Sequence, residues 1–260
     1  MDRTSFFGTA PQWIIFIATV AIIVLSIYSG IFVSRMRRKD GAAADDMPVG
    51  TIVGATLGLL GFMLAFTFSI TASRFDMKKQ LLLEEVNSIG TTFLRAGFLP
   101  EPHCSEVRSL LRKYVDLRIV LAEHPENVNS IIEQSLSIQD EMWKHAETVA
   151  SSDLKNADIV SLFIESLNET IDLQTNRVTV ALVYRIPDII WFAIIGLMVI
   201  SMYVVGYLFM KSHKSNFTII MALSLAFSLV ILMIITFDRS DGKVKLNQQP
   251  MIELQKSLNE

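Results

Sequence analysis

Four stretches of this chain contain no Asp, Glu, Lys or Arg, and each is long enough to cross a membrane. They are Pro11–Ser34, Met47–Ser73, Ile189–Met210 and Ser215–Phe237. An α-helix needs about 20 such residues to span the roughly 30 Å hydrocarbon core of a bilayer. Charged residues make up 19% of the chain, against about 25% in soluble domains. The sequence therefore predicts an integral membrane protein with four transmembrane helices and excludes a disordered chain.

The first apolar stretch has the features of a retained membrane anchor. It runs over Trp13–Val33, with aromatic residues near both edges, as the belts at membrane interfaces require. It is too long for a signal peptide, and no small-residue cleavage site follows it. The basic residues that stop it are Arg35, Arg37, Arg38 and Lys39.

Short polar connections divide the chain into hairpins. Arg35–Met47 joins the first two membrane stretches, and Lys211–Asn216 joins the last two. We therefore predict an all-α integral membrane protein with four transmembrane helices in two hairpins and a helical extramembrane domain inserted between helices 2 and 3. The expected domains are the first transmembrane hairpin at 1–73, the helical extramembrane domain at 74–186, the second transmembrane hairpin at 187–237 and a polar C-terminal tail at 238–260.

The inserted domain has the apolar periodicity of helices throughout. Leu82, Val86, Ile89 and Phe93 follow the i, i+4, i+7, i+11 spacing of one helical face. No helix breaker separates them from the second membrane stretch, so one long helix is expected to leave the membrane and end at Gly97 and Pro100. The domain lacks the period-2 alternation of strands, and we predict no sheet.

Three further amphipathic helices are expected in the inserted domain. One ends at His124-Pro125, the next covers about Asn127 to Ala150, and the last follows a cap at Ser151-Ser152-Asp153 and continues to Pro187. Their apolar faces need partners. A bundle within one chain and a bundle formed between copies of the chain both satisfy that need.

Composition and motifs argue against several classes of function. The net charge of −3 does not suit a nucleic-acid binder, and the single cysteine, Cys104, excludes a disulfide framework. His103, His124, His145 and His213 show no i, i+4 pairing, so no metal site is expected. No phosphate-binding loop or nucleophile elbow is present, so we expect neither an enzyme nor a cofactor.

Small residues recur on one face of the second membrane stretch. Gly50, Gly54 and Gly58 are spaced four residues apart, and Gly61 lies on the same face. Glycines at this spacing let two helix backbones approach closely in lipid. The contact predicted is either self-association of several copies or packing against the first or third membrane helix of the same chain.

Charges in the short loops favour an orientation with both loops inside and with both termini and the helical domain outside. The first loop carries four basic residues, and the second carries Lys211 and Lys214. Basic residues also flank the other ends of the membrane stretches, which weakens the difference. They include Arg74, Lys78, Lys79, Arg185, Arg239, Lys243 and Lys245.

The segment at 50–102 resembles the bestrophin-like domain family, a largely bacterial set of membrane proteins of unknown function. It reads GTIVGATLGLLGFMLAFTFSITASRFDMKKQLLLEEVNSIGTTFLRAGFLPEP. The similarity continues at 110–119 (LLRKYVDLRI), 165–187 (ESLNETIDLQTNRVTVALVYRIP) and 237–254 (FDRSDGKVKLNQQPMIEL). A distant similarity to the bestrophins, which are pentameric anion channels, implies four transmembrane helices, a cytosolic helical domain and a pore lined by the second helix. That sidedness conflicts with the loop charges.

The same resemblance gives a meaning to Phe62, Phe66 and Ile70. In bestrophins, three bulky apolar residues at this spacing on the second helix form a narrow neck, and apolar constrictions can gate by dewetting. The alternative is that these side chains face lipid or pack in the core. The membrane stretches contain no Asp, Glu, His or Arg in their cores, which argues against a proton-coupled pump or a voltage sensor.

The sequence thus predicts an oligomeric and passive ion channel, with the lipid bilayer, small ions and further copies of the chain as partners and no nucleic acid. Similarity to bestrophins implies a pentamer. The expected location is the bacterial inner membrane, with the helical domain on the periplasmic side as the loop charges favour. The alternative function is a non-conducting scaffold or sensor whose helical domain binds a protein.

Overall fold

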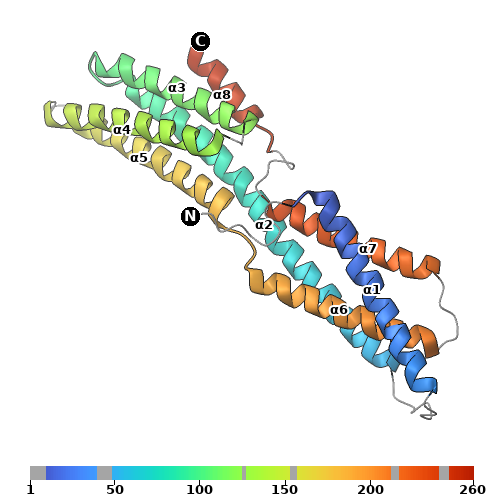
Figure 1. Ribbon diagram of the computed structural model, residues 1–260. Coiled ribbons are helices and arrows are strands. Elements are labelled where there is room, and N and C mark those ends of the chain that lie inside the picture. The colour runs from blue at the N-terminus through green and yellow to red at the C-terminus, as the bar shows by residue number, and fades with distance from the viewer. Residues whose placement is uncertain (1–9, 40–48, 125–126, 153–156, 212–216, 240–245) are drawn as a thin grey trace. The chain divides into compact units, whose positions relative to one another are not determined.

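The computed structural model describes residues 10–39, 49–124, 127–152, 157–211, 217–239 and 246–260. Regular structure in these ranges is helical throughout (Figure 1). Four helices are long and apolar enough to cross a membrane, namely Gln12–Arg37, Val49–Ala96, Ala157–Phe209 with its internal break, and Phe217–Asp238. The predicted all-α membrane fold with four transmembrane helices is therefore confirmed.

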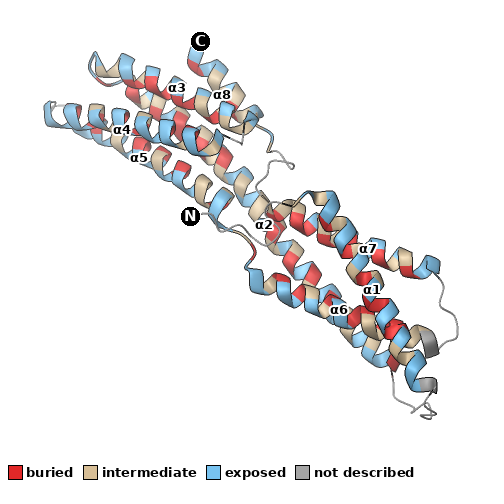
Figure 2. Cartoon of the chain, viewed as in Figure 1, coloured by how far each residue is buried: buried red, intermediate tan, exposed pale blue. Residues whose placement is uncertain are grey.

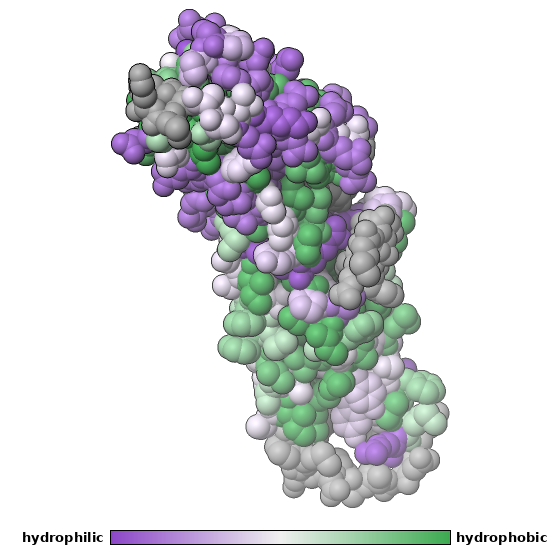
Figure 3. Space-filling view, turned by 90° about the vertical axis from the view of Figure 1, so that its left-hand side faces the viewer, coloured by the Kyte–Doolittle hydropathy of each residue, from purple (hydrophilic) through white to green (hydrophobic). Residues whose placement is uncertain are grey.

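The chain divides into two compact units. Unit 1 comprises Met1–Ser73 and Arg185–Arg239, and unit 2 comprises Arg74–Tyr184 and Ser240–Glu260. On the face shown in Figure 3, the described residues of unit 1 are largely hydrophobic and those of unit 2 largely hydrophilic. An apolar outer surface is what helices in contact with lipid require.

Unit 1 contains the membrane helices. They are α1 (Gln12–Lys39), the first half of α2 (Val49–Ala96), α6 (Asp188–Lys211) and α7 (Phe217–Asp238). Their shared core is aliphatic and rich in isoleucine and methionine, with fully or nearly fully buried side chains at Ile23, Ile27, Leu60, Ile194, Met198, Met202 and Ile234. Each helix buries one stripe and leaves the rest of its apolar surface exposed (Figure 2).

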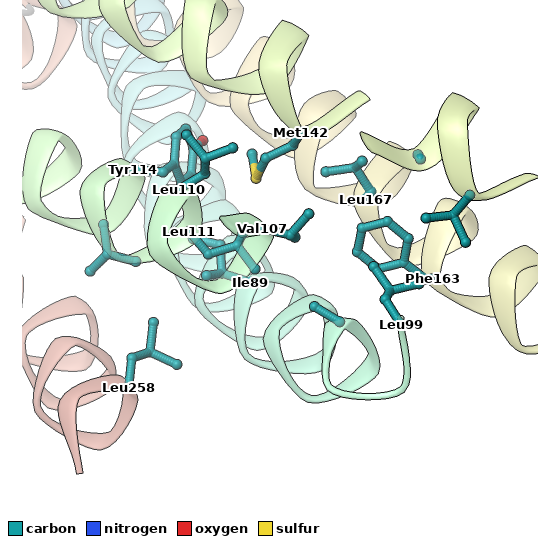
Figure 4. Close-up of a cluster of buried hydrophobic side chains, with 14 of the residues drawn as sticks. Ile89, Leu99, Val107, Leu110, Leu111, Tyr114, Met142, Phe163, Leu167 and Leu258 are labelled. Carbon is teal, nitrogen blue, oxygen red and sulfur yellow. The ribbon is translucent and has the colours of Figure 1, made fainter. Parts of the chain in front are cut away.

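Unit 2 is a helical bundle built within one chain. It contains the second half of α2, α3 (His103–Glu123), α4 (Val128–Ser152), α5 (Ala157–Val178) and the C-terminal helix α8 (Gln249–Asn259). Side chains from all five helices meet in one core, including Ile89, Tyr114, Met142, Phe163 and Leu258 (Figure 4). The apolar stripes predicted from the sequence therefore find partners inside the chain.

The fourth helix of the inserted domain departs from its predicted ends at Ser151, Ser152 and Pro187. Ser151 and Ser152 do not cap it, because they form the end of α4 and donate side-chain hydrogen bonds of 2.8 and 2.9 Å to carbonyls one turn earlier. Asp153 lies outside the described residues. The helix also does not continue to Pro187: α5 ends at Val178 and a single π-helical turn, η3 (Thr179–Val183), follows.

An extended segment separates η3 from α6. Tyr184 has extended dihedral angles, φ −79° and ψ 110°, and α6 starts at Asp188, directly after Pro187. The proline ring disfavours a helical residue before it, which explains the break. Asp238 of α7 fixes the segment at its unit 1 end, since its Oδ1 accepts a 3.0 Å hydrogen bond from the buried Ile186 amide.

Candidate functional site

The candidate site is the exposed face of α2 in unit 1. Leu60 and Leu64 bury one side of this helix, at 0% and 4% exposure, among the other membrane helices. The apolar window of α2 is 17% buried, against 33% to 39% for the other three membrane helices. The helix with the most glycine is thus the one least covered by its own chain.

The glycine stripe makes no close contact among the described residues. A Cβ added at Gly50, Gly54, Gly58 or Gly61 would meet no atom within 4 Å, and all four residues are exposed. Among the described residues, this stripe therefore does not pack against the first or third membrane helix of the same chain, which was one of the two predicted contacts. The open face is free to receive another helix.

Phe62 and Phe66 stand on the same open side of α2. Their side chains are 66% and 57% exposed, and their rings stack with centroids 6.4 Å apart. Ile70 differs from these two residues, because it is more buried than they are and lies nearer the packed side of α2. Residues four apart on an α-helix are offset by about 40°, so a stripe at i, i+4 and i+8 turns away from the face on which it starts.

The polar side chains on the covered side of α2 are satisfied within the helix. Thr67 and Thr71 are 1% and 0% exposed, and their hydroxyls donate 2.7 and 2.8 Å hydrogen bonds to the carbonyls of Met63 and Phe68. The Ser201 hydroxyl of α6 donates to the Thr56 carbonyl at 3.2 Å. Of these bonds, the one from Ser201 joins α6 to α2. The open face of α2 in unit 1 consists of glycine, alanine, phenylalanine and small hydroxyl residues together with Ile52 and Leu59.

Two glycines outside α2, Gly30 and Gly206, make the kind of close backbone contact between helices that the sequence predicts for the glycines of α2. A Cβ at Gly30 of α1 would overlap the Tyr203 carbonyl and lie 2.8 Å from the Tyr207 amide nitrogen of α6. A Cβ at Gly206 of α6 would in turn overlap the Ile27 carbonyl of α1. Sequence reasoning missed this pair because each glycine is isolated in its own helix and its partner is distant in the chain.

A buried charge cluster occupies unit 2. Glu85 of α2 is fully buried, and the Tyr114 hydroxyl donates to its Oε1 at 2.7 Å. Arg118 of α3 places its Nε 3.0 Å from Oε1 and donates from Nη2 to Oε2 at 3.3 Å. Arg177 of α5 also donates to Oε2 through Nη1. Burial of this kind raises the pKa of the Tyr114 hydroxyl to about 12.

This cluster is chemically suited to holding helices together. Two guanidinium groups and one phenol surround one carboxylate, so the carboxylate is compensated although it is removed from water. Sequence reasoning missed it, although a signal exists. Glu85 stands on the apolar stripe of Leu82 and Ile89, and Arg118 follows Leu111 and Tyr114 at helical spacing, so charges of opposite sign occupy two core positions.

One group of metal-ligating side chains also meets in the described part of unit 2. It consists of His103 and Glu106 on α3 and His145 on α4, with one ligand atom of each within 4.8 Å of the others. The spacing of the histidines in the sequence predicts no metal site, because none of them are four residues apart on one helix. Side chains on two neighbouring helices can meet without such spacing.

Comparisons with known proteins point to one family. A scan against protein families matches the Bestrophin-like domain over residues 15–251. A search of curated protein sequences finds no match. Among solved structures, a bacterial bestrophin homologue from Klebsiella pneumoniae is similar, with 13% identity, a TM-score of 0.62 and coverage of 93% of this chain and 97% of that one.

Two further solved structures share the fold. A structure described as a membrane protein has 12% identity, a TM-score of 0.64 and coverage of 93% of this chain and 96% of that chain. Another variant of the Klebsiella pneumoniae homologue has 12% identity, a TM-score of 0.58 and coverage of 94% and 99%. At these identities the likeness concerns the fold.

Proposed function

The chain belongs to the Bestrophin-like domain family, and on that premise we propose that its copies assemble into a passive ion channel whose pore is lined by α2. Transport of small ions, rather than catalysis, is the function that this assembly performs. The observation that carries the proposal is the open face of α2, where the glycine stripe and Phe62 and Phe66 remain uncovered while the opposite face packs.

Glycine favours a protein partner over lipid on this face. A glycine in a helix interior costs about 1 kcal/mol relative to alanine, and lipid chains gain nothing from its small size. A second helix does gain, because its backbone can approach the bare Cα atoms closely. Four glycines at Gly50, Gly54, Gly58 and Gly61 therefore support copies of the chain as the neighbours of α2 in the membrane.

The aromatic residues give the assembled pore its constriction. Phe62, Phe66 and Ile70 would ring the axis as a dry, charge-free neck, with Phe62 and Phe66 on the open face and Ile70 at its edge. Such a neck blocks ions by dewetting until it widens. The described stretches 11–34, 49–73, 189–210 and 217–237 contain no Asp, Glu, His, Lys or Arg, so no carboxylate or imidazole is available there to couple transport to protons.

The bacterial plasma membrane is the location that we propose, since two of the similar solved structures come from Klebsiella pneumoniae. The charges of the short loops support a periplasmic helical domain, whereas the resemblance to bestrophins supports a cytosolic one. The loop charges are a property of this chain itself, and we therefore keep the periplasmic placement as the proposal to be tested.

Flux through liposomes tests the channel. The triple variant Phe62→Ala, Phe66→Ala and Ile70→Ala removes the bulk of the neck, so purified protein should pass chloride, potassium or sodium faster than the parent. Phe32→Ala is the matched control, because Phe32 is a phenylalanine of similar exposure, 63%, on α1. Its flux should equal that of the parent.

The size of the assembly must be checked before flux is compared. Large-to-small substitutions in a packed core cost about 3–5 kcal/mol per phenylalanine, so a buried stripe would yield unstable protein. An intact triple variant that is as tight as empty liposomes would contradict the assignment of the neck. A parent chain that never conducts under any ion gradient would favour the non-conducting scaffold or sensor.

A further inference from the structure

The first turn of α3 and the middle of α4 bring two imidazoles and a carboxylate together. The Nδ1 atoms of His103 and His145 lie 3.0 Å apart, and His145 Nε2 lies 3.4 Å from Glu106 Oε2. The two rings are nearly perpendicular, at 71°, with centroids 5.2 Å apart. Both histidines are half-buried and Glu106 is exposed, so the group is open to solvent on one side.

We propose that His103, Glu106 and His145 bind a divalent transition-metal ion of the zinc class and that the ion links α3 to α4. Imidazole nitrogen with one carboxylate oxygen is a donor set that such ions prefer. This proposal is independent of the channel, because all three ligands belong to unit 2.

The spacing of the nitrogens suits one shared ion. Two nitrogens bound to the same zinc, each at about 2.0–2.1 Å, lie roughly 3.3 Å apart at the tetrahedral angle. The observed 3.0 Å between the two Nδ1 atoms requires a shift of a few tenths of an ångström. Glu106 faces the other nitrogen of His145, Nε2, so its exposed side chain must turn toward the Nδ1 side to bind the same ion. Three protein ligands leave the fourth position to water or to a solute, which is the coordination typical of an open site.

The charges around the three ligands affect how well the site can hold a cation. The amino end of α3 is the positive end of the helix dipole, which opposes a cation. The carboxylate of Glu106 offsets that field within the same turn, and Glu101 adds a second exposed carboxylate whose Oε2 accepts from the Ser105 amide. The thiol of Cys104 is not part of the group, because its side chain packs against the core of unit 2.

The position of the site gives the ion a mechanical role. The helices α3 and α4 run side by side and are connected near Glu123 and Val128 (Figure 1). His103 is the first residue of α3, so the ion would join the helices at the end away from their connection. A link at the open end of a hairpin restrains it more than one beside the loop, because it closes a longer segment of chain.

A hydrogen-bonded chain without metal is the competing arrangement. In it, His145 donates from Nε2 to Glu106 and accepts at Nδ1 from the Nδ1–H of His103, so both nitrogens of His145 have partners. The two arrangements differ in one measurable respect. A metal site makes the stability of unit 2 depend on the ion, whereas a hydrogen-bonded chain contributes equally with and without it.

Measurements of metal binding and of thermal unfolding on the full-length chain distinguish the metal site from the hydrogen-bonded chain without metal. The protein is purified in detergent without a histidine tag, in a Cys104→Ser background, and is stripped of metal with a chelator. Zn²⁺ is then titrated by calorimetry, and Co²⁺ serves as a spectroscopic probe through the visible absorption of a four-coordinate site. Thermal unfolding is recorded with each ion and with the chelator.

We expect one Zn²⁺ per chain, a higher unfolding temperature with the ion and the Co²⁺ spectrum. His103→Ala and His145→Ala should each weaken binding by at least about 100-fold, since loss of an outer-shell partner alone costs roughly 10- to 100-fold. His124→Ala is the control, because His124 is an exposed histidine outside the group, and it should bind as the parent does.

The absence of stoichiometric binding to the parent would overturn the proposal, whatever the variants do. So would binding that both alanine variants retain, because the ion would then reside elsewhere. Should an alanine variant fail to fold, His103→Gln and His145→Gln keep a polar side chain in place while removing the imidazole, and the same binding criterion applies to them.

Discussion

The carbonyl oxygen of Ile27 in α1 occupies the space in which Gly206 of α6 would carry a Cβ atom. On the same pair of helices, Gly30 stands equally close to the backbone at Tyr203 and Tyr207. The two contacts are reciprocal, so each helix supplies the glycine that the other needs. This crossing sets how closely α1 and α6 approach in unit 1, and it leaves no room for a side chain.

Gly206→Ala should destabilise unit 1, because the added methyl group must displace backbone rather than a flexible side chain. Overpacking of this kind typically costs about 1–3 kcal/mol. Gly196→Ala is the matched control: it lies on the same helix with nothing within 4 Å of its added Cβ, and the change should be neutral or stabilising. Thermal unfolding in detergent measures both, and equal melting temperatures would contradict the close crossing.

Gly54→Leu and Gly58→Leu should leave the single chain folded and break the assembly. A leucine at either position meets open space within the chain, but it would intrude where the backbones of two copies are expected to approach. We expect smaller species by native mass spectrometry in mild detergent, in place of the assembly that we propose for the parent. Gly196→Leu serves as the control on α6. An unchanged assembly would mean that this stripe does not lie between copies.

The helices and their apolar faces were predictable from the sequence, because both follow from local patterns. Absence of charge over more than 20 residues identifies a membrane helix wherever it occurs. The spacing of Leu82, Val86, Ile89 and Phe93 predicted the face of α2 that enters the core of unit 2, and these four residues do lie there. Burial requires an apolar stripe, and the stripe is visible without knowledge of its partner.

Features that depend on two distant segments were not predictable. The contact of Gly30 with α6 and the meeting of His103 with His145 each join residues that no local pattern relates. For the ion pairs of Glu85, the sequence shows charges at core positions but not which of them meet. The helix α8 was also missed, because its polar surroundings suggested a tail. Its buried Met251 and Leu258 face α3, and Arg112 donates from Nε to the Leu258 carbonyl at 2.7 Å.

Stability should fall in alkaline solution because of Tyr114. Burial raises its pKa from 10.0 to about 12 in the folded chain. Between these values the unfolded chain has lost the phenol proton and the folded chain keeps it, so each unit of pH costs up to about 1.4 kcal/mol of unfolding free energy. The contribution is fully present below pH 10 and is lost as the pH rises toward 12.

Tyr114→Phe removes that titration. The variant should be less stable at pH 8 by about 1–3 kcal/mol, because Glu85 loses the 2.7 Å hydrogen bond from the phenol. Above pH 10 its stability should fall less steeply than that of the parent. Chemical unfolding, followed by circular dichroism from pH 8 to 11, gives the pH dependence of the unfolding free energy for the parent and for the variant. Parallel dependences would exclude Tyr114 as the source of the loss of stability at alkaline pH.

The side of the membrane on which unit 2 lies can be decided with single cysteines. In a Cys104→Ser background, Lys113→Cys on α3 and Ser137→Cys on α4 each replace an exposed residue of unit 2. If the positive charges of the short loops determine orientation, both cysteines face the periplasm. A membrane-impermeant thiol reagent added to intact spheroplasts should then label them before lysis.

Arg37→Cys supplies the internal control for this experiment. Arg37 is exposed in the last turns of α1, next to the connection to α2. A connection that lies at the start of α2 and a domain that follows α2 face opposite sides, because α2 crosses the membrane once. Arg37→Cys should therefore react only after lysis.

Labelling of Arg37→Cys in intact spheroplasts, with Lys113→Cys and Ser137→Cys protected until lysis, would place unit 2 in the cytosol. The positive charges at Arg74 and Arg239, on the other side of the membrane helices, would then outweigh those of the short loops.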